Sequence, residues 1–132
     1  MSQNSPSGQT WVYLDLARAL EQIGDEQALR GLLPMLQDLL ERDLPQIEAL
    51  LASQDARGAN PLLHSLKGCL PIFCAPALCE HLTQVEHLSK AGGSVEVGAA
   101  YATLGPKLQV LRQEVTQYLA QAQTSAGRSK EC

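Results

Sequence analysis

The chain has 132 residues and a formal net charge of -4, and 45% of its residues are hydrophobic while only 4% are aromatic. An acidic chain without a cationic cluster is a poor partner for nucleic acid, because phosphate binding requires concentrated Lys and Arg. Its apolar runs are far shorter than the roughly 20 residues that a membrane-spanning helix needs, and its polar start lacks the apolar centre of a secretion signal. We therefore expect a cytoplasmic protein that neither binds nucleic acid nor inserts into a membrane.

Leucine and alanine dominate the apolar residues, which favours helices over sheet. The length suits one domain, which we expect to span residues 10–122. The polar segment 1–9 is predicted to be disordered, and the polar segment 123–132 to be a flexible tail.

Residues 10–14 are predicted to form a short turn that tucks Trp11 or Val12 against the rest of the fold. Asp15 is a good N-cap for a brief first helix, because its side chain can accept a hydrogen bond from a free backbone N–H. Gly24 is a natural end for that helix, since glycine adopts the left-handed conformation without strain.

A long second helix is expected from Asp25 to Ser53. Its apolar residues keep the spacing of a buried stripe: Leu29, Leu32, Leu33, Leu36, Leu40, Leu44, Ile47 and Leu51. Pro34 and Pro45 each remove a backbone hydrogen bond, but the stripe continues in phase across both, which predicts bends rather than breaks. Residues 55–59 then read as a connection.

The third helix is predicted to begin at about Asn60, with Asn60 as its N-cap and Pro61 at its first helical position, and to kink at Pro71. Pro76 opens a fourth helix, which the glycine-containing segment 91–94 ends.

A last helix is expected over residues 95–121 in spite of Gly105 and Pro106. The predicted fold class is therefore all-α. Four long antiparallel helices with short connections make an up-down-up-down four-helix bundle, and the short additional N-terminal helix covers one end.

The segment His64-Ser65-Leu66-Lys67-Gly68 places a histidine on the polar face of the third helix. Residues three and four apart share a helix face, so Lys67 and Gly68 lie beside His64. Glycine inside a helix is about 1 kcal/mol less favourable than alanine. Close approach of another molecule to His64 would explain why a glycine is present.

This segment continues with Cys69 and is followed by a leucine-rich stretch that contains Leu78, Leu82 and Glu86. The pattern resembles the signature of histidine-containing phosphotransfer (HPt) domains, in which His-x-Leu-Lys-Gly-Ser precedes a leucine-rich helix ending in Leu-Glu. The upstream segments Asp15-Leu16 and Asp43-Leu44-Pro45 also fall where that family has them.

The resemblance implies a phosphorelay intermediate in two-component signalling, with His64 as phospho-acceptor, Lys67 for charge neutralisation and Gly68 for steric access. The implied partner is a receiver domain of a response regulator or hybrid sensor kinase, which carries a phospho-aspartate and Mg²⁺. The chain has no glycine-rich nucleotide loop and no acidic metal cluster, so we expect no cofactor or metal of its own and no turnover of a small molecule. A monomer is expected, because one patch around His64 suffices for exchange.

The sequence departs from the family pattern at four positions. Cys69 replaces a residue that is usually serine, and Cys74 replaces a common glycine. Pro61 and Pro71 lie on the active helix and leave its length and straightness open, and HPt domains often begin this helix about a turn before the position of Asn60. The stripe of His, Lys and Gly is intact.

Two other functions stay open at this point: an HPt-like helical adaptor that docks on its partners without being phosphorylated, and the dimerising histidine helix of a sensor kinase. The five-residue spacing of Cys69, Cys74 and Cys79, with His81 nearby, could also suggest zinc. Structural zinc ligands are usually two to four residues apart on a turn, and this spacing scatters the thiols around the helix axis. We interpret all the cysteines, including Cys132, as reduced thiols.

Overall fold

The computed structural model describes the backbone of residues 11–91 and 93–131 and the side chains of residues 11–91 and 93–121. Its elements follow in this order: α1 (Leu16–Ile23), α2 (Glu26–Ala52), α3 (Ala56–Cys69), the 3-10 turn η1 (Leu70–Ile72), α4 (Pro76–Ala91) and α5 (Ser94–Glu131). The expectation of an all-α fold is confirmed. The segment 1–9, which was expected to be disordered, lies outside the described residues.

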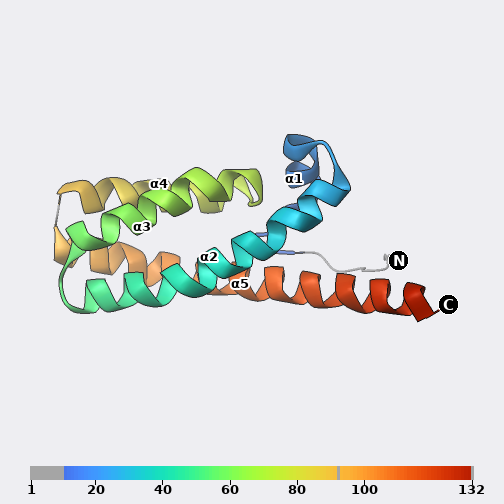
Figure 1. Cartoon of the computed structure of the whole chain (residues 1–132). Coiled ribbons are helices and arrows are strands. Elements are labelled where there is room, and N and C mark those ends of the chain that lie inside the picture. The colour runs from blue at the N-terminus through green and yellow to red at the C-terminus, as the bar shows by residue number, and fades with distance from the viewer. Residues whose placement is uncertain (1–10, 92, 132) are drawn as a thin grey trace.

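The helices lie in two layers. Figure 1 shows α2 and α5 along one side of the molecule and α3 and α4 along the other, with α1 at the end where α2 begins. The chain reverses direction at each connection between the four long helices. Packing of α2 on α3, α3 on α4, α4 on α5 and α5 on α2 closes the arrangement around one core.

Aspartates begin three of the helices, and a glycine ends the first. Asp15 accepts a hydrogen bond from the N–H of Arg18 at 3.0 Å, and Asp25 caps α2 in the same way. Gly24 follows α1 with φ of 84°, in the left-handed region that favours glycine. The predictions for these three residues are confirmed.

The start of α3 was predicted incorrectly. The helix begins at Ala56 rather than Asn60, because Asp55 caps it by accepting a hydrogen bond from the N–H of Gly58 at 2.9 Å. Ala56 and Ala59 are buried, so the additional turn contributes apolar surface to the core.

Prolines affect the helices differently. Pro34 and Pro45 lie inside α2, which continues across both as expected. Pro71 was expected to kink the third helix. Instead, the α-helix ends at Cys69, and the 3-10 turn η1, which contains Pro71, follows directly. Proline has no N–H for the next α-helical hydrogen bond, and at the start of the 3-10 turn that N–H has no partner to bind.

Helix α5 is longer than expected. The prediction placed its end at residue 121, whereas the helical backbone continues to Glu131. Residues 122–131 contain no proline and six of the ten are good helix formers, and the helix continues through Gly127. Helical backbone does not report on mobility, so the flexible tail at 123–132 stays a prediction.

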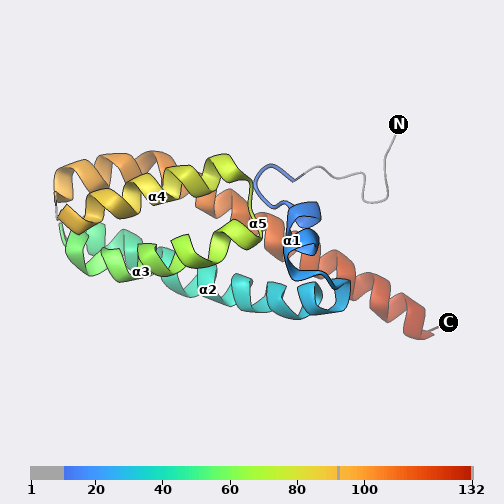
Figure 2. The ribbon, with the colours of Figure 1, turned by 90° about the horizontal axis from the view of Figure 1, so that it is seen from above.

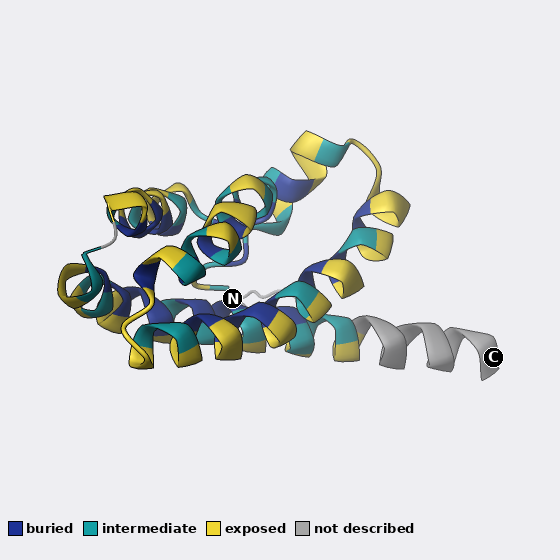
Figure 3. Ribbon diagram, turned by 60° about the vertical axis from the view of Figure 1, so that its left-hand side comes forward, coloured by how far each residue is buried: buried dark blue, intermediate teal, exposed yellow. Residues whose placement is uncertain are grey.

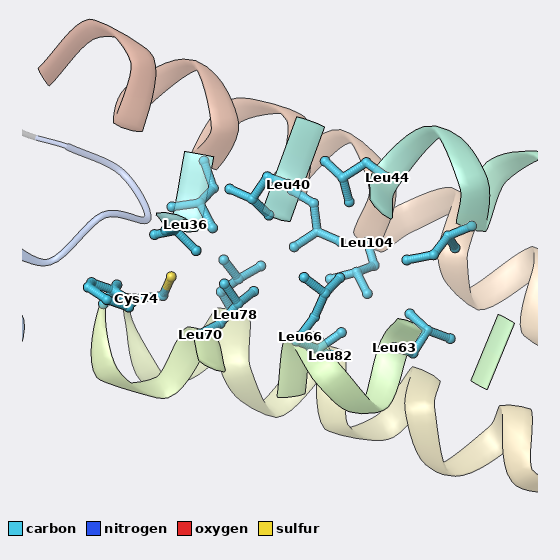
Figure 4. Packing of buried hydrophobic residues seen from close by; sticks show 14 of the residues in the cluster. Leu36, Leu40, Leu44, Leu63, Leu66, Leu70, Cys74, Leu78, Leu82 and Leu104 are labelled. Carbon is cyan, nitrogen blue, oxygen red and sulfur yellow. The ribbon is translucent and has the colours of Figure 1, made fainter. Parts of the chain in front are cut away.

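Leucines from all four long helices fill the core. Figure 3 shows buried positions on the inward faces of the helices and exposed positions on the outward faces. The largest fully buried side chains include Leu36, Leu40, Leu44, Leu63, Leu66, Leu70, Leu78, Leu82 and Leu104. Figure 4 shows these leucines converging between the two layers, with Cys74 at one edge of the cluster. The leucines of α3 thus fix that helix and turn its opposite face outward.

Residues 11–15 form a segment that we call the N-terminal strap. The buried carboxylate of Glu114 accepts hydrogen bonds from the N–H groups of residues 12–14, at 2.9 Å from that of Leu14. On its other side the strap forms an isolated β-bridge between Leu14 and Cys74. Trp11 packs against the core while Val12 is exposed, so Trp11 is the residue that the strap tucks in.

No helix in the described part of the chain has the length and apolarity needed to cross a membrane.

Candidate functional site

The candidate site lies on the outward face of α3. Leu63 and Leu66 of this helix are fully buried, and the side chain of His64 between them is 64% exposed. Helical spacing alone produces this result, because neighbouring residues are rotated by about 100° around the axis. The imidazole of His64 is thus accessible to another molecule.

One side of the imidazole faces a buried carboxylate from α4. Nδ1 of His64 lies 3.4 Å from Oε2 of Glu86, whose side chain is only 1% exposed. Figure 2 shows α3 and α4 side by side, which brings the two residues together although they are 22 positions apart in sequence. The exposed imidazole therefore has one nitrogen next to a carboxylate.

Lys67 also binds Glu86. Its Nζ donates a hydrogen bond to Oε1 of Glu86 at 3.1 Å, and its side chain is 29% exposed. Lys90, one turn after Glu86 on α4, places its Nζ 3.7 Å from Oε2. The structure brings Lys67 to the site as expected, but it holds the ammonium on Glu86 rather than leaving it free beside His64.

Opposing effects act on the pKa of Glu86. Burial raises it, but the hydrogen bonds from Lys67 and Asn60 and the charges of Lys67 and Lys90 together lower the pKa below its ordinary value. Glu86 is therefore a carboxylate at neutral pH.

Asn60 is part of the same cluster. The residue was expected to cap α3, but it lies inside the helix, and its Nδ2 donates to Oε2 of Glu86 at 3.1 Å and to Oγ of Ser89 at 2.8 Å. A weaker contact of 3.3 Å joins the same nitrogen to the backbone carbonyl of Glu86. The side chain therefore links α3 to α4 through Glu86 instead of ending the helix.

Gly68 leaves open space beside the imidazole. It is exposed on α3, and a Cβ built on it would meet no atom within 4 Å apart from its own neighbourhood in the helix. No backbone strain requires a glycine here, because its φ lies outside the left-handed region. The space that it leaves one turn after His64 is available to another molecule.

The cysteines near this helix are separate thiols. Cys74 is buried, whereas Cys69 and Cys79 are partly buried, and none of the three forms a disulfide. Burial raises the pKa of the Cys69 and Cys74 thiols, which disfavours the thiolate that metals bind. Among the residues whose side chains are described, no group of three or more His, Cys, Asp or Glu could hold a metal ion. Cys132 lies outside the described residues.

Glu86 was placed in the family pattern from the sequence but was assigned no role, and Ser89 and Lys90 were not identified. One signal for it exists, because Glu86 follows Leu78 and Leu82 at intervals of four residues and so falls on the buried face of α4. A carboxylate on such a face needs a partner, since a buried charge is costly unless it is paired. The sequence does not reveal that α3 supplies those partners.

Comparison with known families places a match over most of the chain. A family model described as "Hpt domain" matches residues 31–125, which include all of α3 and α4. Neither the comparison with curated proteins nor the comparison with solved structures gives a match.

Proposed function

This chain belongs to the Hpt domain family, which carries out histidine phosphotransfer in two-component phosphorelays, and we propose that His64 is its phospho-acceptor. The donor is the phospho-aspartate of a receiver domain, and a second receiver domain takes the group from His64. The observation that carries this proposal is the exposed imidazole of His64, which has Glu86 beside its Nδ1 and the open surface of Gly68 one turn further along α3.

The position of Glu86 supports Nε2 of His64 as the reacting nitrogen. A carboxylate beside Nδ1 favours the tautomer in which Nδ1 carries the proton, which leaves the lone pair on Nε2. Nε2 attacks phosphorus, the N–P bond forms, and the P–O bond to the aspartate breaks with its electron pair on the leaving carboxylate. Nδ1 keeps its proton, so the imidazole gains positive charge, which Glu86 stabilises as a buried aspartate does in a Ser-His-Asp triad.

Lys67 neutralises charge at the phosphoryl group. The side chain is part-exposed, so its ammonium can leave Glu86 for an incoming phosphoryl group. Lys90 stays within 3.7 Å of Glu86 and limits the cost of that movement. Phosphoryl transfer depends mainly on positioning and on such charge neutralisation, and we expect the receiver to supply Mg²⁺.

The receiver docks over the outward face of α3. Gly68 lets its loops approach His64, and an apolar groove of about 430 Å³ begins at the next residue, Cys69. Leu39 and Met35 of α2 and Ile72 of η1 also line the groove. Apolar surface next to a polar reacting group suits a transient protein interface. One docking face is sufficient for exchange by a monomer. Sedimentation that shows a stable dimer through α3 would contradict the monomeric state.

The test is incubation with a phosphorylated receiver domain and Mg²⁺, followed by intact mass measurement before and after acid treatment. We expect one phosphoryl group that is lost in acid, survives mild base and is absent from a His64→Gln variant. Binding to receivers without any gain of mass would instead favour an adaptor.

A further inference from the structure

We propose that Asn60 is a positioning residue for phosphoryl transfer, which acts on His64 through the carboxylate of Glu86. This inference rests on the proposed function of His64 and adds the residue that fixes which oxygen of Glu86 faces the imidazole. Asn60 lies one turn before His64 on α3, so the two side chains have a fixed relation on one rigid helix.

The two oxygens of Glu86 have different partners. Oε1 accepts from Lys67 at 3.1 Å, whereas Oε2 accepts from Asn60 at 3.1 Å and faces Nδ1 of His64 at 3.4 Å. Lys90 approaches Oε2 at the longer distance of 3.7 Å. Asn60 therefore binds the same oxygen that contacts the imidazole.

Hydrogen bonding determines how the Asn60 amide is oriented. Ser89 Oγ donates to the backbone carbonyl of Glu86 at 2.6 Å, so toward Asn60 it presents a lone pair. Ser89 Oγ and Glu86 Oε2 are thus both acceptors, and only the NH₂ group of Asn60 satisfies both. The two protons of the amide serve these two partners and the weaker contact with the backbone carbonyl of Glu86, and a flip of the amide would lose all three bonds.

The lysines cannot supply this positioning. The side chains of Lys67 and Lys90 are 29% and 53% exposed, and both reach Glu86 through long flexible chains. Asn60 is short, and it is bound to Ser89 at the buried interface of α3 and α4. When Lys67 moves to the phosphoryl group, Asn60 keeps Oε2 at Nδ1, so Nε2 remains the reacting nitrogen.

The test compares Asn60→Asp with the double variant Asn60→Asp/Glu86→Gln. The first change keeps the shape of the side chain but removes both donors and opposes one carboxylate with another. The double variant restores a hydrogen bond between these positions with reversed polarity, while the group that faces Nδ1 of His64 becomes an amide in place of the Glu86 carboxylate. The readouts are ¹⁵N chemical shifts of the His64 imidazole without any receiver, the rate of phosphoryl transfer from a phosphorylated receiver, and thermal unfolding.

In Asn60→Asp we expect a mixture of imidazole tautomers and transfer slowed about tenfold or more, the scale of a small misplacement at a reacting centre. In the double variant thermal stability should rise above that of Asn60→Asp, while the tautomer mixture and the slow transfer persist. Recovery of the rate by the double variant would show a merely structural role and overturn the proposal. Unchanged ¹⁵N shifts and rate in Asn60→Asp would overturn it as well.

Gln37→Glu is the matched control. Its Nε2 donates to Oγ1 of Thr116 at 3.0 Å between α2 and α5, so the change removes an interhelical donor away from the site. We expect lower stability with the tautomer and the rate unchanged. Phosphoryl gain by the wild type tests the proposed function separately. If the wild type gains no phosphoryl group, the role of His64 is wrong. The ¹⁵N shifts are measured without a receiver, so they test the role of Asn60 independently of that result.

Discussion

Replacement of Gly68 with alanine should make the protein more stable and, at the same time, a poorer phosphoryl acceptor. A Cβ at Gly68 would have free space, and the backbone is already helical, so the folded state gains no strain. Gly→Ala inside a helix is worth about 0.5–1 kcal/mol, mostly through the lower entropy of the unfolded chain. For 132 residues, this range corresponds to a rise in Tm of about 2–4 °C.

The loss of function should grow with side-chain size, because any side chain at this position stands between His64 and the docked receiver. Displacement of reacting groups by about 1 Å can slow a reaction about 100-fold, so Gly68→Gln should transfer at least tenfold more slowly than the wild type. The transfer rate of Gly68→Ala should lie between those of the wild type and Gly68→Gln. The assays are thermal unfolding and the rate of phosphoryl transfer from a phosphorylated receiver.

Two other glycines give matched controls. Gly98 of α5 also has free space at its Cβ, so Gly98→Ala should raise Tm by a similar amount and leave the transfer rate unchanged. In Gly58→Ala the new Cβ would collide with the carboxylate of Asp55 that caps α3, so that variant should be less stable. Wild-type transfer by Gly68→Gln, or a lower Tm in Gly68→Ala, would refute the reasoning.

Three further changes test the core, the site and the strap. Leu66→Ala should lower the free energy of unfolding by about 2–5 kcal/mol in denaturant titration, because the side chain is fully buried. The folded-state pKa of Glu86 is lowered, so its stabilisation is present above the ordinary glutamate pKa of 4.5 and is lost as pH falls through the folded value. Glu86→Gln should therefore lose less stability between about pH 6 and pH 3 than the wild type in thermal unfolding. Glu114→Gln weakens the bonds to the strap and should lower stability by about 1–3 kcal/mol, with changed fluorescence of Trp11, the single tryptophan.

Local signals predicted most of the helical layout. Asp15, Gly24 and Asp25 act within a few residues of their own position, so their sequence context is sufficient. The predicted start of α3 was wrong because Asn60-Pro61 has the local pattern of a helix start. Burial of the preceding turn decides where the helix begins. Tertiary packing, which one segment does not show, outweighed the local pattern there.

Within the site, helical spacing was sufficient to predict that His64, Lys67 and Gly68 lie close together, because all three are on α3. The contacts of Glu86 depend on how α3 and α4 pack, and no spacing along the chain contains that information. For the same reason Asn60 was wrongly predicted to be a helix cap, since its partners Glu86 and Ser89 lie on α4.

The N-terminal strap also has a consequence for the order in which the protein folds. Its bonds to Glu114 join residues about 100 positions apart, whereas α3 and α4 pair across a short connection. Long-range contacts cost more loop-closure entropy than local ones, so the strap should form after the rate-limiting step of folding. Glu114→Gln should then accelerate unfolding and leave the folding rate nearly unchanged, which makes the strap a determinant of how long a folded molecule survives rather than of how quickly it forms.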